Sequence, residues 1–134
     1  MLALLTLFRH QLDLQTKRVN WEYYYPLTDH DDGSSLTPAL HVQLACDLEL
    51  LEIAYELFLK GALVDLEDRR GNTAEGIHLA CCGAVWQAVV LGFAGVSLSA
   101  DGYRTHPRWP AGWTRLACTF LHQGQPVFVD LRKE

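Results

Sequence analysis

Clusters of basic residues are missing from this chain of 134 residues. Its 11 lysines and arginines are scattered, and 16 aspartates and glutamates outnumber them, which gives a net charge of -5. Nucleic-acid binding needs lysine and arginine gathered on one face, because contacts to the phosphate backbone dominate the affinity. Arg69 and Arg70 are only a pair, and a solvated loop accounts for them. We therefore expect no nucleic-acid partner.

Cysteine pairs of the kind that bind zinc are also missing. The four cysteines, Cys46, Cys81, Cys82 and Cys118, form no CxxC motif. Cys81 and Cys82 are neighbours in an apolar segment, and neighbouring side chains on a helix diverge by roughly 100°. Buried reduced thiols behave as small hydrophobic groups, and free cysteines are typical of cytosolic proteins. The sequence predicts four free cysteines and a cytoplasmic location.

Short motifs of common enzyme classes and membrane-targeting segments are absent as well. The sequence contains no GxSxG, GxGxxG, HExxH or P-loop motif. Its apolar amino-terminal run lacks both a preceding basic region and a small-residue cleavage site. Residues 76–100 carry no formal charge and are formally long enough to span a membrane. They include His78, Gln87 and four glycines, and the mean hydropathy of the chain is only +0.01, so no membrane span is expected.

The segment at residues 73–95, which carries no charge after Glu75, is predicted to form a helix with protein on all sides. Asn72 is a suitable N-cap, and Glu75 can reach back to it in an arrangement like a capping box. The residues that follow are apolar around nearly the whole helix rather than along one stripe. His78 lies near the N-terminal end, where the helix dipole favours anions. This end of the helix is therefore a candidate anion-binding corner.

The rest of the chain is predicted to be a row of helices followed by short strands. Helical spacing predicts helices at residues 2–12, 15–25 and 50–62, and Gly61 marks the end of the last of these. A further helix is predicted to begin with Thr37 as its N-cap and Pro38 as its first residue. Alternating residues then predict strands at 97–100, 116–121 and 126–131, with a hairpin turn at residues 124–125. We therefore expect a helical region at residues 1–96 and a β-strand segment at residues 97–134.

The densest polar cluster is the loop at residues 29–35. As a metal site it offers three carboxylates and His30, but ligands crowded on one loop rarely complete a site and no second cluster supplies the rest. No metal site is therefore predicted. As an anion site it offers the hydroxyls of Ser34 and Ser35 and free amides before a helix. Spacing alone favours a solvated, capped loop for these residues and a structural role for His78.

Four segments of the chain resemble motifs of glycoside hydrolase family 65, the maltose, trehalose and kojibiose phosphorylases. Residues 20–28 are similar to the family's NWxYYxPxT stretch, and residues 33–41 are similar to its HxSSLSPxxH segment. Residues 72–95 match its NTAEGIHxA…GxxWQAVVxGFxG signature closely. Residues 101–113 resemble its DG…NPxLPxxW link into a C-terminal β-sandwich. The resemblance covers almost the whole chain, in order.

This resemblance implies a mainly α fold: the last helices of an (α/α)6 toroid, followed by a short antiparallel β segment that starts the C-terminal β-sandwich. It also implies a piece of a longer protein, because the family's KQAD motif and its catalytic glutamate would precede residue 1. No catalytic residue is therefore assigned. The phosphate-binding role is carried onto Ser34, Ser35 and His78, with inorganic phosphate as co-substrate and no cofactor.

Two departures from the family pattern bear on the reaction. Extra residues between His30 and Ser34 add a carboxylate that would repel phosphate, since like charges disfavour each other at short range. The residue three positions after the family histidine is often serine, and here it is Cys81. A hydrolase, or a phosphorylase with a different acceptor, is therefore an alternative within the family.

The leading hypothesis is the C-terminal part of an inverting α-glucoside phosphorylase that carries the phosphate half of the site. Its ligands would be inorganic phosphate and a disaccharide or glucose phosphate. The alternative from another class is a non-catalytic helical module that keeps the fold and acts in assembly or regulation. Helices from a closed ring expose apolar flanks, so a homo-oligomer or a complementing N-terminal half is the expected partner. His78, Ser34 and Ser35 are expected to face one cavity.

Overall fold

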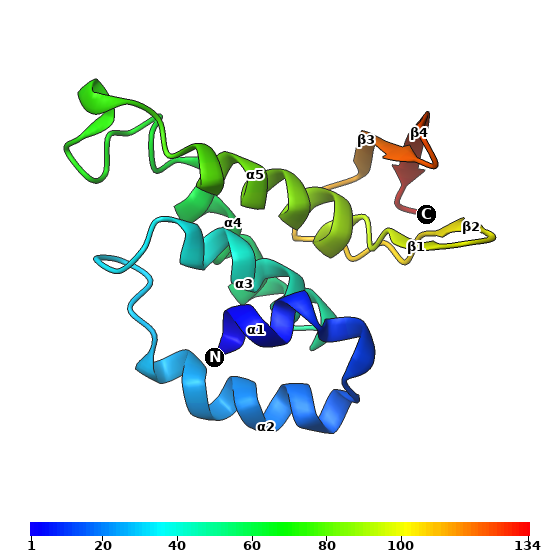
Figure 1. The fold of residues 1–134 in the computed structure, drawn as a ribbon, viewed down its shortest axis with the longest axis horizontal. Helices are drawn as coiled ribbons and strands as arrows, with labels where there is room; N and C mark the ends of the chain where they lie inside the picture. The colour runs from blue at the N-terminus through cyan, green and yellow to red at the C-terminus, as the bar shows by residue number, and fades with distance from the viewer.

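The computed structural model describes residues 1–134 as a row of helices followed by two antiparallel hairpins (Figure 1). The α-helices are α1 (Leu2–Leu7), α2 (Leu14–Tyr24), α3 (Leu36–Asp47), α4 (Leu51–Ala62) and α5 (Leu79–Gln87). The strands are β1 (Ser97–Ser99), β2 (Gly102–Arg104), β3 (Arg115–His122) and β4 (Gln125–Arg132). A π-helix, Ala88–Phe93, continues α5 directly. The prediction of a mainly helical chain with a short antiparallel β segment is confirmed.

The helices alternate in direction along the chain. α1, α3 and α5 run one way, and α2 and α4 return the other way (Figure 1). α3 packs against α1, α4 and α5, and most of its residues are buried, from Pro38 to Cys46. It is the central helix of the molecule. The N-termini of the three parallel helices consequently lie at the same end.

α3 and α4 approach each other closely at Ala39 and Gly61. A Cβ built on Gly61 would lie 2.8 Å from the Cβ of Ala39, closer than side chains pack. α4 ends at Ala62, where the sequence predicted, and Gly61 lies in its last turn. The missing side chain brings the end of α4 beside the start of α3.

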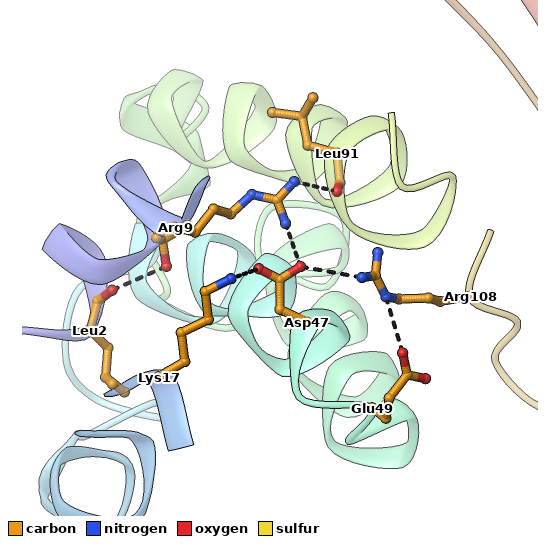
Figure 2. A network of polar contacts seen from close by, with 8 residues as sticks. Leu2, Arg9, Lys17, Asp47, Glu49, Leu91 and Arg108 are labelled. Carbon is orange, nitrogen blue, oxygen red and sulfur yellow. Dashed lines mark hydrogen bonds and ion pairs between the residues drawn. The ribbon is translucent and has the colours of Figure 1, made fainter. Parts of the chain in front are cut away.

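The carboxylate of Asp47, at the C-terminal end of α3, joins several segments of the chain (Figure 2). It lies 2.8 Å from both Arg9 Nη1 and Lys17 Nζ and 3.4 Å from Arg108 Nη2. Arg9 also donates to the backbone oxygen of Leu91 at 2.8 Å. These charged side chains are largely buried, so their partners within the chain replace water. The network holds the turn after α1, helix α2 and the loop before β3 against the central helix.

The β3–β4 hairpin packs on the helices. Its strands pair in register from Arg115 opposite Arg132 to His122 opposite Gln125. Gln123 and Gly124 form the turn, with φ of 50° and 77°, one residue earlier than predicted. The buried residues of this hairpin belong to the same hydrophobic core as the helices: Leu116, Phe120 and Val129. The strands themselves lie where the alternation placed them.

The prediction of one helix over residues 73–95 with Asn72 as its N-cap is wrong. A short 3-10 turn, Thr73–Glu75, is followed by Gly76 at φ 133°, and α5 begins only at Leu79. The side chain of Asn72 caps nothing. The exposed fractions of Leu79 and Trp86 are 75% and 49%, so α5 also lacks protein on one side.

Other element boundaries differ by a few residues. The helix expected at residues 2–12 ends at Leu7 and is followed by a separate 3-10 turn, Arg9–Gln11. α3 has Ser35 rather than Thr37 as its N-cap. Strand β2 pairs with β1 and was not predicted.

None of the helices has both the length and the apolar character needed to cross a membrane.

Replacing Asp47 by alanine is expected to lower the free energy of unfolding by about 3–5 kcal/mol, because it leaves buried cations without a counter-charge. Urea unfolding followed by circular dichroism measures this. Glu67→Ala is the matched control: Glu67 pairs with Arg69 at an exposed position and should cost less than about 1 kcal/mol. Equal losses in the two variants would contradict the role given to Asp47.

Candidate phosphate-binding site

Two helix N-termini meet at the end of the molecule opposite Asp47. Ser35 is the N-cap of α3, and His78 is the N-cap of α5. In the first turn of α5, the Cys81 thiol donates to the backbone oxygen of Ser35 at 3.1 Å and to that of Gly61 at 3.5 Å. The first amides of each helix have no partner within the helix, and the dipole makes this end positive. Together these ends form a surface that favours an anion.

Cys81 explains how this chain tolerates one of its departures from the family pattern. Burial raises the pKa of the Cys81 thiol, which therefore stays protonated and able to donate. A serine hydroxyl at this position would donate in the same way. The Cys81 thiol thus links the start of α5 to the start of α3.

A cavity of about 40 Å³ opens beside Ser35. Three cationic side chains line it: Lys60 at the end of α4, and Arg69 and Arg70 in the loop before α5. Spacing in the sequence did not single out Lys60, because only the folding of α4 against α3 brings it to Ser35. The carboxylate of Asp31 also lines the cavity. The cations, the helix N-terminus and the hydroxyl are the groups there that bind phosphate.

The extra carboxylate in the loop before α3 is paired with one of these cations. Asp31 Oδ1 lies 2.6 Å from Lys60 Nζ. Arg69 likewise pairs with Glu67 at 2.6 Å, whereas Arg70 makes no ion pair. The loop also closes on itself, because the amides of Asp31 and Asp32 both donate to Asp29 Oδ1. The repulsion expected from the additional carboxylate is therefore partly neutralised by Lys60.

The three predicted phosphate ligands occupy different settings. Ser35 lines the cavity, whereas Ser34 and His78 do not. Ser34 is exposed, and its Oγ accepts from the Leu36 amide at 3.4 Å. All three residues lie at the N-terminal ends of α3 and α5. That one anion contacts all three side chains stays a prediction.

His78 is held by a residue that the sequence did not single out. Its Nδ1 lies 2.6 Å from Asp65 Oδ1, and its backbone amide donates to Asp65 Oδ2 at 2.8 Å. The hydrogen bond from the His78 side chain holds the pKa of Asp65 below its usual range. The ring is therefore fixed with Nδ1 toward Asp65.

A second pair of imidazoles lies beside the cavity. His30, which lines it, has Nε2 at 3.1 Å from Nδ1 of His41. His41 is buried in α3, and this burial, with His30 nearby, lowers its pKa to about 4. Tyr25 packs against the His30 ring and stacks on Trp21. These contacts give His30 and His41 a structural role in anchoring the loop before α3.

Comparison with known families gives one match over most of the chain. The profile of the glycosyl hydrolase family 65 central catalytic domain matches residues 1–87. Among solved structures, a human-microbiome protein provisionally assigned as a kojibiose phosphorylase is similar over 98% of this chain, with 27% identity and a TM-score of 0.87. This chain covers 19% of that protein.

Curated relatives show the same partial coverage. The kojibiose phosphorylase of Caldanaerobacter subterraneus subsp. tengcongensis is 36% identical over 132 residues, which is 98% of this chain and 17% of the relative. The maltose phosphorylase of Bacillus subtilis is 36% identical over 125 residues, 93% of this chain and 16% of the relative. The α,α-trehalose phosphorylase of Thermoanaerobacter brockii is 35% identical over 133 residues. The chain thus spans about a sixth of the length of these relatives.

Proposed function

This chain belongs to glycosyl hydrolase family 65, and we propose that it supplies the phosphate-binding part of the catalytic domain of an inverting disaccharide phosphorylase. The observation that carries the proposal is the meeting of the α3 and α5 N-termini, with Ser35 and His78 as their N-caps. In such a reaction phosphate attacks the anomeric carbon while a general acid protonates the leaving oxygen. We place Ser34, Ser35 and His78 on the phosphate and assign no residue here to the acid.

The proposed ligands are inorganic phosphate with a disaccharide, or a glucose phosphate in the reverse direction. The cations beside Ser35 favour phosphorolysis over hydrolysis. A phosphate nucleophile is an anion that cationic side chains bind, whereas a water nucleophile is neutral and needs no such side chains. Asp31, the feature that argued for a hydrolase, is bound to Lys60. The chain spans about a sixth of the length of its relatives. We therefore propose the complete reaction for a whole catalytic domain and not for these residues alone.

The alternating helices support a finer proposal for the fold. α1, α3 and α5 would be inner helices of an (α/α)6 toroid, and α2 and α4 outer ones. Residues 1–96 would form the last part of that toroid, and residues 97–134 the start of a C-terminal β domain. The exposed apolar face of α5 is where a further inner helix would pack.

The same face favours the second candidate function, a non-catalytic helical module that works in assembly or regulation. Leu79 and Trp86 are large apolar residues exposed on one helix, and such surfaces mark protein contacts. This candidate requires the fold and the contact but no bound phosphate. Anion binding therefore separates the two functions.

Phosphate should bind the chain, and Ser35→Ala and His78→Gln should each weaken that binding by roughly three- to tenfold or more, as expected for one hydrogen bond to an anion. Titration with inorganic phosphate, followed by amide NMR shifts, measures the affinity. Ser99→Ala, which alters a hydroxyl in the β1–β2 hairpin, is the control. Equal affinity in all of these proteins would remove the site assignment.

The 134-residue chain alone should show no phosphorolysis or hydrolysis of maltose, trehalose or kojibiose. A positioned proton donor contributes about 10²–10⁴-fold, and we assign none to this chain. Release of glucose or glucose phosphate is the measurement. Turnover above background that His78→Ala abolishes would contradict the proposal and would require an acid among Glu22, Asp31, Asp32 and Glu75.

The exposed face of α5 should make the chain associate as a homo-oligomer. Light scattering over a range of concentrations is expected to show this, and replacing both Leu79 and Trp86 by glutamate should restore the monomer. Leu27→Glu is the control, since Leu27 is about as exposed as Leu79 but lies beyond α2. A monomer at high concentration that binds no hydrophobic dye would count against association.

A further inference from the structure

Asp65 contacts His78 through both of its carboxylate oxygens. One oxygen accepts the His78 backbone amide at 2.8 Å, and the other lies 2.6 Å from ring Nδ1. Asp65 follows the end of α4, 13 residues before His78, so this contact exists only when the loop folds back. Two bonds from one carboxylate fix both the backbone at the start of α5 and the rotation of the ring.

The contact decides which ring nitrogen is available to a ligand. A carboxylate only accepts, so Nδ1 carries a proton and donates to Asp65. Nε2 has no partner within the chain, and it is not among the buried polar atoms without one. The side chain is 25% exposed, which leaves Nε2 open to solvent. When both ring nitrogens carry protons, Asp65 takes Nδ1–H and the ring presents Nε2–H to an anion as a charged donor.

We propose that Asp65 is a positioning residue for phosphate, acting through His78: it orients the ring, fixes Nδ1 as the inner donor and presents Nε2–H to the anion. The inference rests on the proposed phosphate site. Asp65 itself makes no contact with phosphate in this arrangement. Hydrogen bonds that orient a ligating histidine in this way commonly set its tautomer and its basicity.

The sign of the effect separates this role from simple charge repulsion. Removing a carboxylate near an anion site should tighten anion binding if only the net charge matters. Removing Asp65 should weaken it if the ring loses its orientation and its charge. The two explanations therefore predict opposite changes in affinity for one substitution.

Asp65→Asn tests the proposal with little change of shape. The backbone N–H of His78 still needs an oxygen acceptor. The asparagine side chain at position 65 therefore turns its oxygen toward that N–H and its NH2 toward ring Nδ1. Nδ1 must then accept, and the ring switches to the Nε2–H tautomer without charge. Long-range 1H–15N spectra of the imidazole report this switch, and His78→Gln identifies the His78 signals. Phosphate affinity should fall about five- to tenfold, the difference between a charged and a neutral donor.

Glu67→Gln is the control, since it removes the same charge two residues away at an exposed pair with Arg69. It should leave the ring spectrum unchanged and should not weaken phosphate binding. In the His78→Gln background, Asp65→Asn should have no further effect on affinity. In the unsubstituted chain, added phosphate should shift the Nε2 signal more than the Nδ1 signal, a measurement that depends on no variant.

The outcomes distinguish this inference from the proposed function. If the chain binds phosphate and His78→Gln weakens binding, but Asp65→Asn leaves it unchanged or tightens it, the role of Asp65 is overturned and the phosphate site stands. A shift at Nδ1 alone on adding phosphate would overturn it too. If the chain binds no phosphate, the proposed function falls and this inference falls with it.

Discussion

The buried carboxylate of Asp47 is the interaction on which the rest of the structure depends. Its cationic partners Arg9, Lys17 and Arg108 are 30 to 61 residues away in the sequence. Without Asp47 these cations would repel one another in a setting with little water. One residue therefore couples the turn after α1, helix α2 and the link between the hairpins to the central helix.

The same helix separates this network from the candidate site. Asp47 ends α3 and Ser35 caps its start, roughly 18 Å apart at 1.5 Å per residue. The dipole makes the C-terminal end negative, where the surrounding cations are favourable, and the N-terminal end positive. An anion at Ser35 is thus far from the buried carboxylate. Two of the carboxylates near that end, Asp65 and Asp31, are bound to His78 and to Lys60.

The sequence predicted what depends on local periodicity. Helices α2 and α4 and strands β3 and β4 lie within a few residues of their predicted positions. The start of α5 was predicted wrongly, because Asp65 and Asp68 reach across the loop and take the amides of His78 and Thr73. These partners lie 5 and 13 residues apart within a loop and leave no periodic signal.

The candidate site was predictable only in part for the same reason. Resemblance to the family, and not spacing, selected Ser34, Ser35 and His78. Neither method singled out Asp65 or Lys60. Both come to the site from the end of α4, which lies there because Gly61 lets α4 press against Ala39. Close packing between helices therefore supplies the charged groups that surround the predicted residues.

Gly95, at the end of the helical region, also helps to bring Arg108 to Asp47. Gly95 has φ 60°, and a Cβ there would collide with the backbone oxygen of His106. Because glycine permits this approach, His106 donates its amide to Gly95 at 3.2 Å and Arg108 donates its own to Phe93 at 2.7 Å. These bonds bring the Arg108 side chain to Asp47. A side chain at position 95 would therefore act at a distance, by withdrawing one of the cations that neutralise the buried carboxylate.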